Sequence, residues 1–223
     1  METTQALKSR AANGDADAQF RVGYRMAFGR RRPRDGRQVA VAYWRLAANH
    51  GHPRAVFYLA TSYDFGAGVR RDLTQAIALY RRAAALGHDM AQYNLGFSYA
   101  HGDGIRKSLH IAIKWFRKAA EAGNADAQRD LGYCLHEGTG VGANPREAAR
   151  WYRCAAVQGD AKAQFNLGLC YFEGDGVTRS TRWARHWLGK AASQGHSRSK
   201  AMLGRFAAQQ QYAADGAARR RGC

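Results

Sequence analysis

A glycine recurs along the chain at an almost constant interval, and this recurrence limits the possible folds more than any other feature. The interval is 37 residues once and 36 residues thereafter. The recurring glycines are Gly14, Gly51, Gly87, Gly123, Gly159 and Gly195. A period of this length is typical of a protein in which each copy forms one supersecondary unit and neighbouring copies share a core. It predicts complete units near 14–50, 51–86, 87–122, 123–158 and 159–194, with a partial unit at 195–213.

Each copy has the pattern of two helices joined by a glycine turn. In the third copy, Ala91, Leu95, Gly96 and Tyr99 form a helical stripe, and the second half repeats alanines and aromatic residues at helical spacing. Four copies carry Gly-x-Gly between the halves, which suits a left-handed helix C-cap, followed by a favoured N-cap residue. These N-cap residues are Asp72, Ser108, Asn144 and Ser180. The pattern therefore predicts an all-α fold of about five helix-turn-helix repeats.

A second glycine stands inside the first helix of most copies, where it should cost about 1 kcal/mol relative to alanine. These glycines are Gly23, Gly96, Gly132, Gly168 and Gly204. We expect a neighbouring helix to cross each of them too closely for a β-carbon, so that packing offsets the cost.

The repeated motif is similar to the Sel1-like repeat, a relative of the tetratricopeptide repeat. The motif reads A-x-A-Q-x-x-L-G-x-x-Y-x-x-G-x-G-V, then A-x-x-W-x-x-A-A. In the third copy it is carried by Ala91-Gln92, Leu95-Gly96, Tyr99, Gly102, Gly104-Ile105, Ala112, Trp115 and Ala119-Ala120. The resemblance covers about residues 11–207 and implies a right-handed α/α solenoid that acts as an adaptor for protein complexes, often in bacterial signalling, secretion or stress pathways. The first copy departs from the motif, because Arg30 to Arg34 replace the glycine turn, so the conformation of the loop at 29–37 is left open.

We expect one solenoid domain over residues 1–213 and a basic, mobile tail over 214–223. A half-unit helix near 4–13 should cap one end, and a last helix near 197–213 should cap the other. The longest apolar runs have six residues, far short of the roughly 20 that span a bilayer. The N-terminus also lacks the apolar region of a signal peptide. The expected protein is therefore a cytoplasmic monomer with no membrane span.

One face of the first helix in each copy is predicted to bind a partner. Its residues lie 3, 7, 10 and 14 positions after the leading glycine and vary between copies, whereas the packed positions do not. Mixed aromatic, amide and acidic side chains suit recognition of an extended peptide, and solenoids use their concave surfaces for binding. The predicted partner-binding residues are Arg21, Tyr24, Tyr58, Asn94, Phe97, Asp126, Asp130, Tyr133, Asn166 and Leu169. The alternative is that these are ordinary solvated helix faces.

The second helices carry a basic ridge on what should be the convex back. Its residues are Arg81, Arg82, Lys114, Arg117, Lys118, Arg146, Arg150, Arg153, Arg182 and Lys190. Because the chain has 35 Lys and Arg against 17 Asp and Glu, a formal charge of +18, such a ridge could contact nucleic acid or an acidic surface, or could simply be solvated. A third possible function is that of an immunity protein that blocks a toxin.

The sequence predicts no enzyme, metal site or cofactor. Ser197 and Lys200 match S-x-x-K, but the other motifs of penicillin-recognising enzymes are missing. His50 and His52 form a local pair without an evident third metal ligand. The four cysteines, Cys134, Cys154, Cys170 and Cys223, are too few for a disulfide scaffold and are expected to be thiols.

Overall fold

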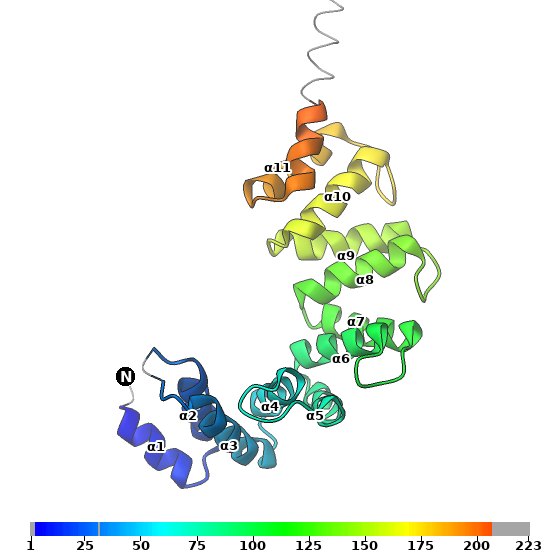
Figure 1. Cartoon of the computed structure of the whole chain (residues 1–223). Helices are drawn as coiled ribbons and strands as arrows, with labels where there is room; N and C mark the ends of the chain where they lie inside the picture. Colours follow the sequence, from blue (N-terminus) through cyan, green and yellow to red (C-terminus); the bar gives the residue numbers. More distant parts are fainter. Residues whose placement is uncertain (1–2, 31, 207–223) are drawn as a thin grey trace, which may run out of the picture. The chain divides into compact units, whose positions relative to one another are not determined.

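Every regular element that the structure describes is a helix (Figure 1). The structure is a computed structural model that describes residues 3–30 and 32–206. The helices are α1 (Thr4–Ala12), α2 (Ala16–Phe28), α3 (Gly36–Asn49), α4 (Pro53–Phe65), α5 (Leu73–Ala85), α6 (Asp89–His101), α7 (Leu109–Glu121), α8 (Ala125–Glu137), α9 (Pro145–Val157), α10 (Ala161–Glu173) and α11 (Thr181–Ser193). Residues 197–206 are also helical. The predicted all-α fold is confirmed.

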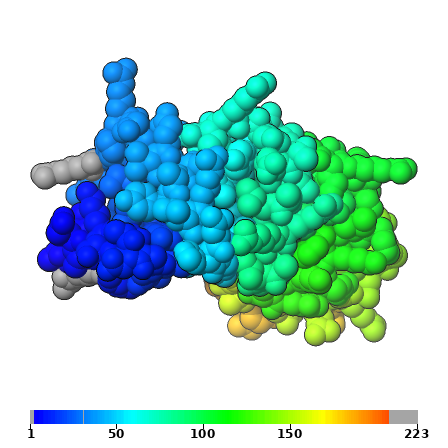
Figure 2. Space-filling model, turned by 90° about the horizontal axis from the view of Figure 1, so that it is seen from below, coloured from blue at the N-terminus to red at the C-terminus, as the bar shows by residue number. Residues whose placement is uncertain are grey.

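The chain divides into two compact units at Ala122 and Gly123. In the first unit, α1 packs on α2, and the pairs α2–α3, α4–α5 and α6–α7 follow one another. Helix α3 also packs on α4, and α5 packs on α6. Figure 2 shows successive segments of this unit side by side in chain order, from blue to teal. In the second unit, α8–α9 and α10–α11 pack in the same way, and α9 contacts α10. The proposed domain limits of 1–213 and 214–223 remain a prediction, and the tail lies outside the described residues.

The helix ends follow the local signals in the sequence. Gly66 caps α4 in the left-handed conformation, with φ 68° and ψ 30°, and the corresponding glycines cap α6, α8 and α10 in the same way. All four predicted N-cap side chains accept a hydrogen bond from a backbone N–H at the start of a second helix. The predicted first capping helix is present as α1. The last one is helical through residue 206, and its remaining predicted residues lie outside the described part of the chain.

The first copy, whose loop conformation the sequence left open, lacks the left-handed cap. Helix α2 ends at Phe28 and is followed by Gly29 in an extended conformation, with φ −64° and ψ 149°. Asp35 precedes α3 without making a side-chain cap. This turn therefore differs from the four Gly-x-Gly turns in how it leaves the first helix and in how it enters the second.

The glycines inside the first helices mark close helix crossings, as predicted. A β-carbon on Gly23 would lie 2.6 Å from Nε1 of Trp44, and one on Gly132 would lie 2.8 Å from the ring of Tyr152. Gly96 meets Phe116 and Gly168 meets Leu188 at similar distances. Gly204 is the exception, since a β-carbon there would have no neighbour within 4 Å in the described part of the chain. Four glycines thus let a large side chain of the second helix lie directly on the first helix.

At three junctions, successive copies are joined by a ring contact. Phe20 of α2 stacks on His52, Phe57 of α4 stacks on His88, and their ring centroids lie 4.9 and 4.4 Å apart. Phe165 of α10 packs on His196 at 4.8 Å. Each of these histidines precedes the next helix and accepts, through Nδ1, a hydrogen bond from a backbone N–H of its first turn. Each of these histidines therefore caps the helix that follows it.

We predict that replacing Gly132 by alanine destabilises the protein. The new methyl group would press on Tyr152, and overpacking of this kind costs about 1–3 kcal/mol, more than the roughly 1 kcal/mol gained in helix propensity. Gly189 in α11 is the matched control, because a β-carbon there meets nothing within 4 Å. Urea unfolding should show Gly132→Ala less stable and Gly189→Ala slightly more stable than the wild type. Equal stability of the two variants would show that the Tyr152 ring moves aside freely.

The capping histidines predict a loss of stability in mild acid. Burial lowers the pKa of His88 below its ordinary value of 6.5, with Asp89 opposing and Arg54 adding to the shift. The pKa of His196 is also lowered, by burial first and then by the positive charges of Arg198 and Lys162, whereas Asp160 raises it. Because the unfolded chain then binds more protons, the contribution of these groups is present above about pH 6.5 and is lost as the pH falls through the lower native pKa.

Melting temperatures measured between about pH 7 and pH 5 test this prediction. The double variant His88→Asn with His196→Asn should depend less on pH than the wild type, since asparagine caps a helix without titrating, as Asn124 does at α8. His110→Asn, at an exposed histidine, should keep the wild-type profile. Identical pH profiles for all three proteins would contradict the assignment of the acid sensitivity to His88 and His196.

Candidate functional site

The ten predicted partner-binding residues all lie on first helices of the pairs, and none of them is buried. In the first unit, Arg21 and Tyr24 lie on α2, Tyr58 on α4, and Asn94 and Phe97 on α6. In the second unit, Asp126, Asp130 and Tyr133 lie on α8, and Asn166 and Leu169 on α10. Each unit therefore carries half of the predicted set, and the chemistry of the two halves differs.

The first unit presents a cluster of aromatic rings on α2 and α4. The ring centroids of Tyr24 and Phe28 lie 4.9 Å apart, and Tyr58 lies 5.7 Å from Tyr24 and 5.9 Å from Phe28. Tyr24 and Phe28 are 41% and 52% exposed, which is unusual for such large apolar groups in a cluster. Burial, followed by the effect of Tyr24, raises the pKa of Tyr58, so its hydroxyl stays protonated.

Beside these rings is a cavity of about 310 Å³, which we call the aromatic cavity. It is lined by Ala27, Phe28, Arg37, Trp44, Tyr58, Thr61, Ser62, Phe65, Gly66 and Ala67. Phe65, at the end of α4, is 76% exposed. Phe28 and Phe65 were not among the predicted partner-binding residues, although both lie 14 positions after a leading glycine and could have been included on that ground.

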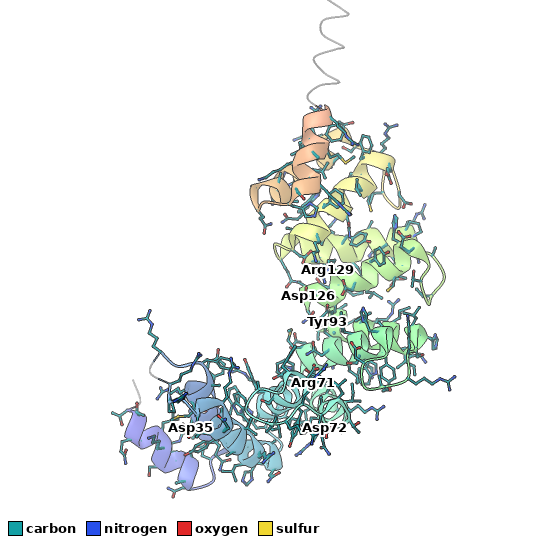
Figure 3. All side chains as sticks on the ribbon, in the orientation of Figure 1. Asp35, Arg71, Asp72, Tyr93, Asp126 and Arg129 are labelled. Atoms are coloured by element: carbon teal, nitrogen blue, oxygen red, sulfur yellow. The ribbon has the colours of Figure 1, made fainter. Side chains whose placement is uncertain are left out.

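A second cavity of about 360 Å³ lies between α4, α5 and α6. It is lined by Asp64, Phe65, Arg71, Leu73, Ala76, Ile77, Tyr80, Tyr93, Asn94, Phe97, Ser98 and Asp103, of which Arg71 and Tyr93 are labelled in Figure 3. It brings together two predicted residues, Asn94 and Phe97. The buried Tyr80 hydroxyl donates to Asp64 at 3.0 Å and interacts with the Asn94 amide, so Asn94 is held from within the fold.

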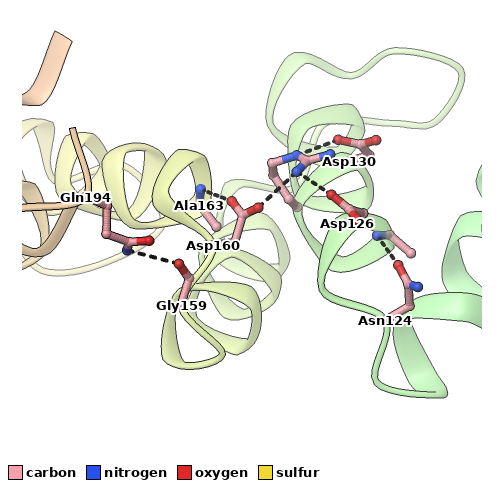
Figure 4. Close-up of polar contacts among 9 residues, drawn as sticks. Asn124, Asp126, Asp130, Gly159, Asp160, Ala163 and Gln194 are labelled. Atoms are coloured by element: carbon pink, nitrogen blue, oxygen red, sulfur yellow. Dashed lines mark hydrogen bonds and ion pairs between the residues drawn. The ribbon is translucent and has the colours of Figure 1, made fainter. Parts of the chain in front are cut away.

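In the second unit, Arg129 of α8 binds three carboxylates (Figure 4). Its guanidinium donates to Asp126 at 2.7 Å, to Asp130 at 2.8 Å and to Asp160 at 2.9 Å. The Arg129 side chain is only 14% exposed. Burial alone would lower its pKa, but the hydrogen bonds and charges of the aspartates outweigh burial and raise it. Three carboxylates and one guanidinium give this cluster a formal net charge of −2.

Arg129 and Asp160 occupy the positions of the ring contact that joins copies at three other junctions. Arg129 stands six positions after its leading glycine, where Phe20, Phe57 and Phe165 stand in other copies. Asp160 caps α10 and occupies the position of the capping histidines. An ion pair thus takes the place of a phenylalanine–histidine contact. Sequence reasoning missed Arg129, although its departure from an otherwise aromatic position was visible.

A cavity of about 410 Å³ beside this cluster gathers three predicted residues. It is lined by Arg129, Asp130, Tyr133, Lys162, Phe165, Asn166, His196, Ser197 and Arg198. Asp130, Tyr133 and Asn166 therefore line one cavity, and Lys162 and Arg198 add positive charge to it. Leu169 is half-buried one turn further along α10 and does not line this cavity.

Comparison with models of protein families identifies the family to which this chain belongs. Residues 16–52, 53–88, 89–124, 125–160 and 161–196 each match the family model described as Sel1 repeat. The chain belongs to the Sel1 repeat family. Its fold class, an all-α solenoid of five Sel1 repeats, is thereby confirmed, and proteins of this family generally act as protein-interaction scaffolds.

Three proteins of known structure, all from bacteria, are similar to this chain. A protective antigen of uropathogenic Escherichia coli strains that displays an SLR fold has 33% identity and a TM-score of 0.87 over 93% of this chain. A Sel1 repeat protein from Oxalobacter formigenes has 34% identity and a TM-score of 0.84 over 91% of it. The matches cover 44% and 58% of those two proteins. Immunity protein Pa5087 from Pseudomonas aeruginosa has 26% identity and a TM-score of 0.51, covering 82% of this chain and 67% of that one. No curated protein matches significantly.

The basic ridge of this Sel1 repeat chain is partly occupied by contacts within the fold. Arg81 donates to the Tyr99 hydroxyl at 3.0 Å and Arg153 to the Tyr171 hydroxyl at 2.6 Å, each reaching the next copy. Arg82 hydrogen-bonds the main-chain oxygen of Ala48. Lys118 and Lys190 lie over the rings of Trp115 and Trp187. At least half of the ten ridge cations thus take part in contacts within the fold, and the ridge is more than a row of solvated charges.

The Sel1 repeats show no arrangement for metal binding in residues 3–30 and 32–206, where no three His, Cys, Asp or Glu side chains are grouped as ligands. Cys134, Cys154 and Cys170 are free thiols, and Cys223 lies outside the described residues. Burial raises the pKa of Cys134 to about 11 and that of Cys170 to about 12, so both stay protonated. Of the described helices, none combines the length and apolar character that crossing a membrane requires.

We predict that the Arg129–Asp160 pair can be replaced by a phenylalanine–histidine pair. Arg129→Phe and Asp160→His should each destabilise the protein, because each leaves one member of the pair with an unsuitable neighbour. The double variant should recover about 1 kcal/mol or more relative to the sum of the two losses, since it recreates the contact of Phe57 and His88. Urea unfolding of the four proteins measures this coupling. Strictly additive losses would mean that the two positions do not act as a pair.

Proposed function

We propose that this chain is a non-enzymatic scaffold that binds a segment of a partner protein on the free faces of its first helices. The observation that carries the proposal is the set of exposed aromatic side chains beside cavities, above all Phe28, Phe65 and Phe97. Apolar groups of this size that remain exposed in one cluster are typical of a protein interaction site. The family, whose members generally serve as interaction scaffolds, supports the same function.

The ten residues predicted from the sequence remain the proposed partner-binding set, to which we add Phe28 and Phe65. A partner backbone would pair with amides such as Asn166, and partner side chains would fill the cavities. The proposed setting is a monomer in the bacterial cytoplasm. Binding of nucleic acid through the basic ridge is a weaker proposal, because at least half of the ridge cations already contact other residues of the chain.

A second candidate function is inhibition of a toxin. It is favoured by one observation, the likeness to an immunity protein from Pseudomonas aeruginosa at 26% identity. Such a function would use the same free faces, with the toxin as the partner protein.

Truncating aromatic side chains on the free faces should strongly reduce capture of partners from the native cell. Phe97→Ala with Tyr133→Ala removes one exposed ring from each unit, and loss of an interface anchor costs more than 1 kcal/mol, so recovery should fall about tenfold. Arg146→Ala with Arg182→Ala removes two exposed ridge charges, which contribute about 0–1 kcal/mol, and should leave capture intact. Quantitative mass spectrometry of the captured proteins compares the three baits.

The opposite pattern would refute the proposal. If the ridge variant loses the partners and the aromatic variant keeps them, the binding surface is the basic ridge. Circular dichroism of both variants should match the wild type, because all four replaced side chains are exposed.

A further inference from the structure

Charge and aromatic residues are segregated along the free faces in chain order. In the first unit these faces carry Arg21 and Arg54 against a single acid, Asp17, together with five aromatic residues. The five are Tyr24, Phe28, Tyr58, Phe65 and Phe97. In the second unit they carry one base, Lys162, against four acids and one aromatic residue, Tyr133. The four acids are Asp126, Asp130, Glu137 and Glu173. The two units therefore offer different chemistry to a partner.

The aromatic cavity has one charged lining side chain among its described residues, and that side chain is a cation. Arg37, just inside α3, is exposed and stands beside Phe28, Trp44, Tyr58 and Phe65 in the lining. Within residues 3–30 and 32–206, no acid takes part in the lining. A carboxylate brought to this cavity would meet Arg37 without a competing acid in the wall, and arginine pairs well with carboxylates.

Further positive charge lies next to the same rings. The Arg54 guanidinium lies 4.6 Å from the centre of the Phe20 ring and interacts with the Tyr58 hydroxyl. Phe20 lies 5.7 Å from Tyr58, whose ring is part of the cavity wall. The aromatic surface is thus bordered by arginines on α3 and α4.

The aromatic cavity is large enough for one big apolar side chain and adjoins the second cavity. Its volume of about 310 Å³ lies at the lower end of the range of ligand pockets, roughly 300–1,000 Å³. Phe65 lines this cavity and also the second cavity of about 360 Å³, so the two share one wall. The second cavity is lined by one base, Arg71, against two acids, Asp64 and Asp103, and so has a formal net charge of −1. The preference for an acidic partner therefore belongs to the aromatic cavity.

We infer that the aromatic cavity binds a large apolar side chain from an acidic segment of a partner protein, with a neighbouring carboxylate paired to Arg37. The inference rests on the proposed scaffold function and adds the class of partner sequence to it. The apolar side chain is the anchor, because it displaces water from the rings of Phe28, Tyr58 and Phe65. The carboxylate selects acidic over basic segments.

Three fluorescent peptides that differ only in their core test the inference by fluorescence anisotropy with the full chain. The cores are Asp-Glu-Trp-Glu-Asp, Asp-Glu-Ala-Glu-Asp and Lys-Arg-Trp-Arg-Lys. The acidic tryptophan peptide should bind about tenfold or more tightly than each of the other two, since an anchor residue carries much of the binding energy. The acidic alanine peptide controls for general attraction to a chain of charge +18.

Two variants and two matched controls locate the site. Phe65→Ala and Arg37→Glu should each weaken the acidic tryptophan peptide about tenfold. Val157→Ala removes an apolar side chain that is 71% exposed, close to the 76% of Phe65, but lies on α9. Arg146→Glu makes the same change in net charge as Arg37→Glu in the second unit. Both controls should bind like the wild type.

Several results would overturn the inference. These are equal binding of the two acidic peptides, tighter binding of the basic peptide, equal effects of variants and controls, or no binding of the acidic tryptophan peptide at about millimolar concentration. Concentration-dependent dimerisation that Phe65→Ala abolishes would show that a second copy of the chain fills the cavity. Since the proposed function is tested at Phe97 and Tyr133, it can stand when this inference fails.

Discussion

The contact between a bare helix backbone and a large side chain of its partner helix is the constraint on which the repeat units depend. At Gly23 the nearest atom to a missing β-carbon would be Nε1 of Trp44, and at Gly132 it would be the ring of Tyr152. Such a contact fixes how closely the two helices of a pair approach. It also fixes the position of the outer end of the large side chain. Trp44 lies on Gly23 with one edge and lines the aromatic cavity, so the packing of the pair and the shape of the candidate site depend on the same residue.

The fold could be predicted from the sequence because its signals are local and are repeated. A left-handed C-cap at Gly66 needs only the turn in which it lies, and the N-cap at Asp72 needs only the helix that follows, so each can be recognised without knowledge of the rest of the chain. The crossing glycines were also predictable, since an unfavourable residue that recurs must have a compensating contact. Gly204 was the exception because that contact depends on what packs beside the helix, which its own sequence does not encode.

The candidate site was only partly predictable, for the opposite reason. Helical spacing placed Tyr24, Tyr58 and Phe97 on a free face, but it could not show that Phe65 lines two cavities. Nor could it show that the carboxylates of Asp126 and Asp130 share one buried guanidinium. Contacts between copies join residues about 30 positions apart, as Arg129 and Asp160 are, and such pairs are invisible to a pattern that is read one helix at a time.

The exchange of a ring contact for an ion pair between the fourth and fifth copies limits how the gene for such a chain can change its length. Repeat proteins gain and lose copies by unequal recombination, which preserves the fold only when the new neighbours fit each other. Loss of residues 159–194 would keep the helical register, since one whole period is removed, but it would place Arg129 against His196 instead of Asp160. The imidazole would then face a cation, and three carboxylates would become two. The last two complete copies are therefore expected to be inherited together, whereas copies joined by phenylalanine and histidine are interchangeable at their junctions.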